Sequence, residues 1–401
     1  MKSNSIYKII FLLLLLLAFY GLKLLPVKIT NWDYPLTFFL FALSFYSFNT
    51  YTLYSKTLYS KVILLYTFFV LCSCIYSWYF NGQELYLVIV HSYYYFGILF
   101  FFYLLKSKLS ASEAEKALII MSITCCCCYI LQWLIYPTIL FYGADSESKT
   151  LFTYRVRIPG SIGCYCLLLY GINRYLLQKH FKYLFYTLLG GLPILIMGFR
   201  SLNTLSLLSI FVMIPFVLHK IPKTMFYSLL GVISILLLMQ TPIVKLKLAE
   251  MEERNETGQS FENEDYVRFR EFDYYWNEQF ANPVEKFFGG GVPTDPESKY
   301  DKDIHGWAYS NGLYWDDLGL VGLSMIIGMP AVALLLIMYV VCIWRCKDSH
   351  LQYIRFTLLI VLLGSLFTTA ELFRQGNILL LSLFLYIEYK YHQERVKNIA
   401  S

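Results

Sequence analysis

The chain has 401 residues, of which 58% are hydrophobic and only 15% are charged, and its formal net charge is +6. Soluble domains carry about 25% charged residues, so the composition excludes a row of soluble domains, a disordered chain and a disulfide-rich secreted module. The 36 Tyr residues suit a chain with many membrane–water interfaces, where Tyr and Trp accumulate. No basic stripe lies outside the connecting loops, so we expect no nucleic-acid partner. The composition predicts an all-α polytopic membrane protein.

Apolar segments of the length that crosses a bilayer as a helix, about 20 residues, recur along the chain. The first fits the alternation of the others, and no small-residue cleavage site of a signal peptide follows Leu25. We predict about twelve transmembrane helices, near 8–25, 34–54, 62–80, 85–105, 117–140, 158–178, 181–198, 201–218, 222–244, 318–344, 352–371 and 375–391.

The Lys and Arg residues of the connecting segments predict the orientation. With the N-terminus in the cytoplasm, eighteen of them fall on the cytoplasmic side and seven in the short outer loops. Cytoplasmic loops carry an excess of Lys and Arg. We therefore expect both termini in the cytoplasm, which requires an even number of spans.

The predicted spans divide the chain into three parts. Residues 1–244 hold helices one to nine, residues 245–317 form a large outer loop, and residues 318–401 hold the last three helices and a cytoplasmic tail. The loop is polar, aromatic and acidic, and structureless loops of such length are usually functional. We expect short helices near 263–281 and 305–317, packed on the membrane face.

Arginine residues gather on the predicted outer side. Arg200 lies between two apolar segments, Arg155 and Arg157 precede a Pro-Gly pair, and Arg268 and Arg270 lie in the long loop. An ionisable residue at a membrane boundary is a functional-site hypothesis. The rigid guanidinium fork suits phosphate oxygens, so these residues are candidates for binding a diphosphate.

Each arginine also has an ordinary structural interpretation. Arg200 can extend to the interface, and Arg155 and Arg157 can anchor a helix end. Arg268 and Arg270 can pair with carboxylates on an exposed helix; the neighbours in reach are Glu264, Asp265, Glu271 and Asp273.

His305 is the one histidine of six in the long loop. A neutral histidine can accept the proton of an attacking hydroxyl, and the carboxylates of Asp303, Asp316 and Asp317 can orient it or replace it as the base. The alternative is a polar surface residue.

Nothing in the sequence requires a metal ion or a cofactor. There is no Walker A sequence and no HExxH motif. Cys125 to Cys128 are consecutive, and four consecutive side chains of a helix point in different directions and cannot converge on one ion. We expect structural cysteines.

The loop and the helix that follows it carry a family resemblance. Asn282-Pro283 and Gly289-Gly290-Gly291 are followed by His305 and then by Trp315-Asp316-Asp317-Leu318-Gly319-Leu320-Val321-Gly322. This order, with Arg200 in a GFRSL segment, resembles the bacterial O-antigen polymerase and O-antigen ligase superfamily. Gly306 follows His305 where the ligases typically carry Asn, which favours the polymerase branch.

The resemblance implies a GT-C-like glycosyltransferase of the bacterial inner membrane, with the large loop in the periplasm. Its donor would be a polyprenyl-diphosphate-linked glycan, and its acceptor a second repeat unit (polymerase) or lipid A-core (ligase). Membrane lipid is an implied partner, as are a chain-length regulator and a flippase of the same pathway. The implied roles are leaving-group stabilisation by the arginines and proton transfer by His305, Asp316 or Asp317. A transporter or flippase and a non-enzymatic scaffold remain rival interpretations.

Overall fold

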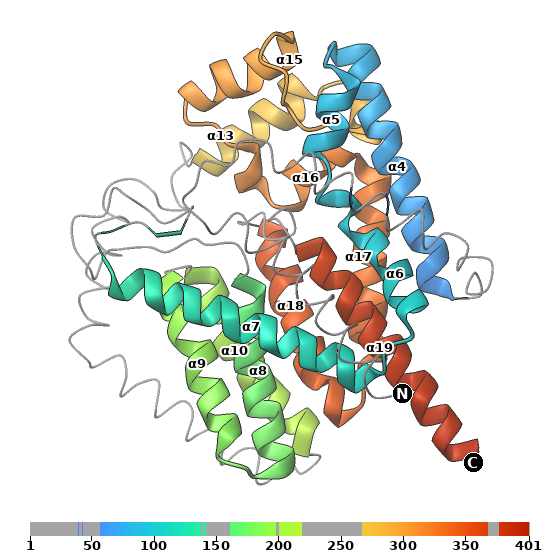
Figure 1. The fold of residues 1–401 in the computed structure, drawn as a ribbon. Helices are drawn as coiled ribbons and strands as arrows, with labels where there is room; N and C mark the ends of the chain where they lie inside the picture. The colour runs from blue at the N-terminus through green and yellow to red at the C-terminus, as the bar shows by residue number, and fades with distance from the viewer. Residues whose placement is uncertain are drawn as a thin grey trace.

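The computed structural model of the chain describes residues 57–136, 161–197, 200–218, 267–367 and 377–400, together with 39, 42, 138, 140 and 141. Within these residues the fold is helical, without a β-strand (Figure 1), as the composition predicts. Three predicted spans, near 8–25, 34–54 and 222–244, lie outside the described residues except for positions 39 and 42.

Several helices meet the requirements for crossing a membrane. Helix α4 (Leu58–Asn81), α7 (Ala111–Leu134) and the segment Ser349–Leu366 are long and apolar enough. A fourth candidate is the pair α5 (Leu85–His91) and Tyr95–Ser107, which is bent by 62°. The protein is therefore a helical protein associated with the membrane.

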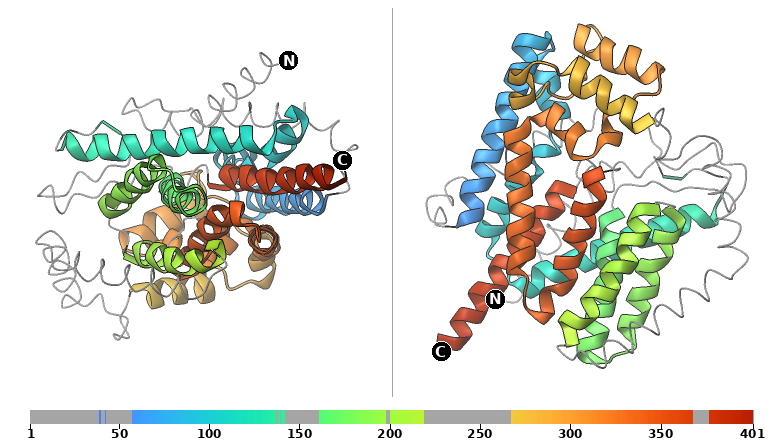
Figure 2. Two further views of the ribbon diagram at one scale, coloured as in Figure 1. Left: turned by 90° about the horizontal axis from the view of Figure 1, so that it is seen from below. Right: turned by 180° about the vertical axis from the view of Figure 1, so that it is seen from behind.

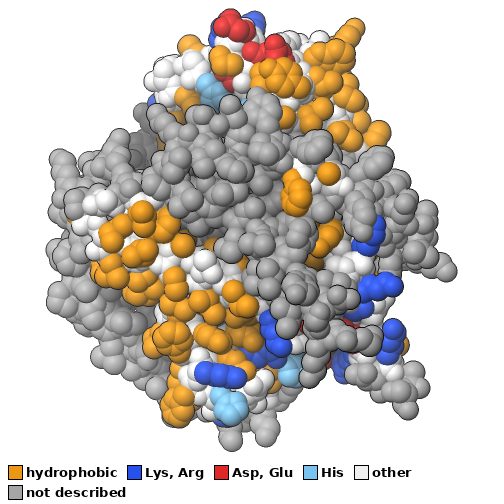
Figure 3. All heavy atoms as spheres, viewed as in Figure 1, with side chains coloured by type: hydrophobic (Ala, Val, Ile, Leu, Met, Phe, Trp, Pro, Cys, Tyr) orange, Lys and Arg blue, Asp and Glu red, His pale blue; other side chains and the backbone are white. Residues whose placement is uncertain are grey.

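Helix α4 shows how the helices divide their side chains between the core and the surroundings. Tyr66 and Val70 are fully buried, whereas Phe68 and Ile75 are more than half exposed. Large apolar side chains on an outer face are typical of a helix that contacts lipid. Figure 3 shows such apolar surface between the two ends of the molecule.

A bundle of three helices follows α7 in the chain. Helices α8 (Ser161–Gln178), α9 (Lys182–Met197) and α10 (Arg200–Leu218) stand side by side, and α7 lies across α8 and α9 (Figure 2). The second group consists of α17 (Met329–Arg345), α18 (Gln352–Phe367) and α19 (Asn377–Ala400).

The predicted single span near 318–344 is two helices. Helix α16 (Leu320–Ile327) ends at Gly328, whose φ of 84° breaks the helix, and α17 follows. The last carbonyls of a helix lack partners within it. Here the Gly290 amide donates to the Met325 carbonyl (2.6 Å) and the Gly291 amide to the Ile326 carbonyl (3.0 Å). The loop glycines thus satisfy the end of α16.

The short loop helices lie at the end of the molecule where α4 meets α5. The Asn81 Nδ2 donates to the Gly290 carbonyl at 3.0 Å. These helices are α13 (Val267–Asp273), η2 (Tyr274–Gln279), α14 (Pro283–Phe288), α15 (Lys299–Asp301), η3 (Lys302–Ala308) and η4 (Trp315–Leu318). We call this the loop end.

The opposite end holds the α6–α7, α8–α9 and α17–α18 turns, where α6 is Phe100–Ser107. The Asn173 Nδ2 near the end of α8 donates to the Ser349 carbonyl at 2.8 Å. Lys and Arg side chains gather there, whereas Asp and Glu side chains lie at the loop end (Figure 3). We call it the basic end.

Candidate functional site

The best-defined polar cluster of the loop end is built around Arg268. Its Nη1 lies 2.7 Å from Asp317 Oδ2 and 3.3 Å from Glu271 Oε2. Arg268 and Glu271 are one turn apart on α13, and Asp317 comes from η4. The Arg268 side chain is 23% exposed and that of Asp317 is 41% exposed, so the ion pair can be reached from solvent.

Glu271 is the buried member of this cluster. Its side chain is 1% exposed, and its Oε1 accepts a hydrogen bond from the Tyr314 amide at 3.0 Å. Burial raises the pKa of Glu271 to about 7; the nearby charge of Asp316 also raises it, whereas the Tyr314 amide and Arg268 lower it. Glu271 therefore holds Arg268 against the segment that leads into η4.

His305 forms a second polar pair at the loop end. Its Nδ1 lies 2.7 Å from Asp301 Oδ1, four residues earlier. The Asp301 side chain is 10% exposed and that of His305 is 42% exposed. A histidine whose one nitrogen is held by a carboxylate presents the other nitrogen for proton transfer.

Two tyrosine rings connect the pairs. The His305 ring contacts the Tyr309 ring with a centroid distance of 4.9 Å, and Tyr309 contacts Tyr314 at 4.9 Å. The Tyr314 amide, in turn, bonds Glu271. Trp307, packed on Tyr274 at 4.9 Å, is 52% exposed. The surface of the loop end thus combines the ion-paired guanidinium of Arg268, the His305 ring bonded to Asp301 and exposed aromatic rings.

The structure brings only some of the predicted site residues together. Arg268 and Asp317 pair directly, and Asp316 is an exposed neighbour of the cluster. Arg270 is also exposed. Two positions along a helix correspond to a rotation of about 200°, so Arg270 projects away from the direction of Arg268.

Arg200 begins α10. The α8–α9 turn lies at the basic end, so α10 begins at the end of this bundle that is directed away from the basic end. Arg200 therefore lies on the side of the α8–α10 bundle that is opposite the basic end, and α13, which carries Arg268, lies beyond it (Figure 1). The other two predicted arginines, Arg155 and Arg157, lie outside the described residues.

Two residues of the site were not singled out from the sequence. In the sequence Glu271 is one of several possible partners of an arginine, and Asp303, Asp316 and Asp317 are the carboxylates expected beside His305, whereas the structure pairs His305 with Asp301. Helical spacing was the available signal, since Glu271 is three residues from Arg268 and Asp301 four residues from His305.

The residues that the structure describes include no group of three or more His, Cys, Asp or Glu side chains placed to hold a metal ion. The consecutive cysteines point in different directions: Cys125 and Cys126 are buried, whereas Cys127 is exposed.

No protein-family model matches the chain, and no curated protein matches it. The fold and the loop-end cluster define its class: a helical membrane protein with an arginine–carboxylate cluster in a large polar loop.

Proposed function

We propose that this protein is a glycosyltransferase that polymerises polyprenyl-diphosphate-linked oligosaccharide repeat units into O-antigen or a related surface polysaccharide. The observation that carries the proposal is the Arg268 cluster, a solvent-reachable arginine held by Asp317 and Glu271. Arginine binds phosphate oxygens through two parallel hydrogen bonds, and a diphosphate leaving group needs such stabilisation.

The charge distribution supports a periplasmic site. Lys and Arg residues favour the cytoplasmic side of a membrane, and the basic end lies opposite the loop end. The proposal therefore places the basic end in the cytoplasm of a bacterial inner membrane, both termini with it, and the loop in the periplasm.

The reaction joins two glycans. A hydroxyl oxygen of the acceptor attacks the anomeric carbon of the donor and forms the new glycosidic bond. The bond from that carbon to the diphosphate oxygen breaks, and the electron pair leaves with the diphosphate. The hydroxyl proton passes to Nε2 of His305, whose Nδ1 is held by Asp301. Arg268 stabilises the diphosphate, and Arg200 is a second candidate for this role.

Asp317 acts in this proposal as the exchangeable partner of Arg268. An exposed ion pair contributes only about 0–1 kcal/mol, so a diphosphate can replace the Asp317 carboxylate at little cost. Glu271 stays in place, because it is buried and bonded to the Tyr314 amide.

The pairing of His305 with Asp301 would serve a second candidate equally well, a ligase that transfers the finished glycan to lipid A-core. The bond-making step is the same and only the acceptor differs. A flippase and a chain-length regulator of the same pathway are the expected partners of the polymerase.

The test is glycan analysis of a strain that lacks the gene, complemented with the wild-type gene as the control. A gel ladder reduced to single repeat units on the lipid core supports the polymerase. A core without glycan, with polymer kept on the lipid carrier, indicates the ligase. An unchanged ladder contradicts both the polymerase and the ligase and favours the transporter or scaffold interpretation.

A further inference from the structure

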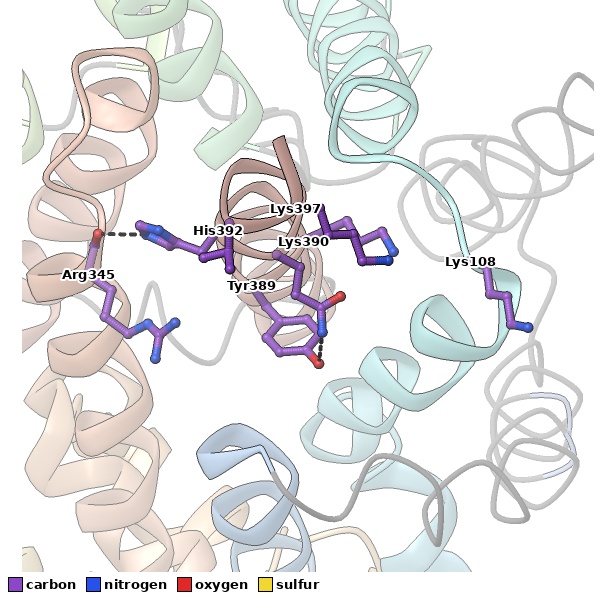
Figure 4. Close-up of a pocket in the computed structure, with 8 residues that line it drawn as sticks. Lys108, Arg345, Tyr389, Lys390, His392 and Lys397 are labelled. Carbon is purple, nitrogen blue, oxygen red and sulfur yellow. Dashed lines mark hydrogen bonds between the residues drawn. The ribbon is translucent and has the colours of Figure 1, made fainter. Parts of the chain in front are cut away.

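The basic end contains a hollow beneath the last turns of α19. It has a volume of about 670 Å³ and is lined from α17, α19 and the α6–α7 corner. Figure 4 shows Arg345 and His392 on one side of α19, and Lys397 and Lys108 on its other side. This hollow is far from the loop-end cluster, and the proposed reaction makes no use of it.

The lining of the hollow is strongly basic. Its charged and titratable residues are Lys108, Arg345, Lys390, His392 and Lys397. No Asp or Glu is among the described lining residues. Two carboxylates of α19 lie nearby and both are engaged. Glu388 is fully buried, with Arg345 Nε 2.7 Å and His392 Nε2 3.3 Å from its Oε1, and Glu394 accepts a hydrogen bond from the Ala111 amide. The lining of the hollow therefore carries a net positive charge, which favours the binding of an anion.

The α6–α7 corner, which lines one side of the hollow, has a defined backbone conformation. Lys108 has a φ of 54°, and only one other non-glycine residue of the described chain, Lys179, has a positive φ. A side chain in this left-handed region is unfavourable by roughly 1–2 kcal/mol. Tyr386 Oη donates to the Leu109 carbonyl, and the Ala111 amide donates to Glu394 at 3.2 Å. These bonds hold the α6–α7 corner against α19.

The hollow lies where the composition of α19 changes from apolar to charged. Residues from Ile378 to Ile387 are buried and mainly apolar, and charged residues begin at Glu388. Trp344, which precedes Arg345 in α17, is 66% exposed, with Lys347 Nζ 4.4 Å from its ring centroid. Exposed Trp side chains mark the level of the lipid headgroups.

We propose that this hollow binds a phosphate-bearing anion, supplied by the headgroup of an anionic phospholipid of the cytoplasmic leaflet. Basic pockets between helices on that side bind such headgroups. The hollow is open enough for a headgroup, and its apolar lining, Val396 and the Tyr389 ring, suits the glycerol backbone.

The test uses purified full-length protein in nanodiscs that contain phosphatidylcholine with or without phosphatidylglycerol. Native mass spectrometry measures lipid retained after release, and thermal unfolding measures stabilisation. The test variant is Lys390→Gln with Lys397→Gln. The matched control is Lys179→Gln with Lys182→Gln, which removes the same charge from exposed residues of the α8–α9 corner. Inorganic phosphate without phosphatidylglycerol is a separate arm.

We expect selective retention of phosphatidylglycerol and a roughly 30-fold weaker affinity in the Lys390/Lys397 variant, since each lysine near the surface contributes about a fivefold factor. The control variant should keep the wild-type affinity. Equal losses in both variants, or equal retention of the two lipids, would overturn the site. Stabilisation by inorganic phosphate alone, without lipid retention, would overturn the lipid as the source of the anion. None of these outcomes depends on glycan transfer.

Discussion

The guanidinium of Arg268 and the carboxylate of Asp317 lie 2.7 Å apart, although α13 and η4 stand at opposite ends of the described loop sequence. Glu271 makes this approach possible, because it accepts both the Arg268 guanidinium and the Tyr314 amide. One buried carboxylate thus fixes the arginine on one side and the segment leading to Asp317 on the other.

Replacing Arg268 should remove the stabilisation of the leaving group. We expect Arg268→Ala to lower turnover by about 100-fold or more, as the loss of one transition-state donor does. Arg270→Ala is the matched control, since its side chain is exposed and projects away from the cluster. Turnover of purified protein with a polyprenyl-diphosphate-linked donor is the measurement. Equal activity of the two variants would contradict the role of Arg268.

Asp317→Asn distinguishes a counter-ion from a base. If Asp317 only pairs with Arg268, the variant should bind a polyprenyl diphosphate about two- to fivefold more tightly, because an exposed pair is weak. Its turnover should persist. A large fall in turnover with unchanged binding would instead assign proton transfer to Asp317. Binding by titration and turnover on the same preparation separate the two outcomes.

The raised pKa of Glu271 predicts two pH effects. Its ordinary pKa of 4.5 rises to about 7 in the folded protein. Between these values the folded protein keeps a proton that the unfolded chain releases. This proton stabilises the folded protein. Its contribution to the free energy of unfolding is fully present below about pH 4.5 and is lost as the pH rises through about 7.

The second effect concerns binding. Below about pH 7 the neutral Glu271 leaves Arg268 with one anionic partner, Asp317, so a diphosphate should bind more tightly at pH 6 than at pH 8. Glu271→Gln should abolish this difference. A difference that persists in the variant would show that another group is responsible.

Asp301 should matter only through His305. We expect His305→Ala to lower turnover by about 100-fold, within the range of general base catalysis, and Asp301→Asn to lower it less. The double variant should be no worse than His305→Ala alone, because the two residues act as a unit. Asp303→Asn is the control. Additive losses in the double variant would show that Asp301 acts independently.

The close packing of the loop glycine Gly291 against α4 can be tested by stability. Gly291 has a φ of 76°, and a Cβ there would lie 2.5 Å from the Ser77 Cβ; Gly312 has a φ of 72° and open space around it. Gly312→Ala should cost about 1–2 kcal/mol of backbone strain, and Gly291→Ala about 1–3 kcal/mol more from overpacking. Equal unfolding temperatures for the two variants would contradict the close contact.

Much of the helical architecture follows from the sequence by itself. A segment of about 20 apolar residues in a bilayer must form its backbone hydrogen bonds internally, so α4, α7 and α18 could be located from local composition. The arginines at one side and the histidine in the loop were likewise visible as residue types.

The tertiary structure alone decided which of these residues act together. The pairing of Arg268 with Asp317 and the docking of Gly290 on Met325 join segments that are distant along the chain, and no local pattern encodes such a contact. The break at Gly328 is stable because another segment supplies partners to the carbonyls at the end of α16. Helices form from interactions between near neighbours, whereas the site depends on backbone groups and charges that find partners only when the chain is folded.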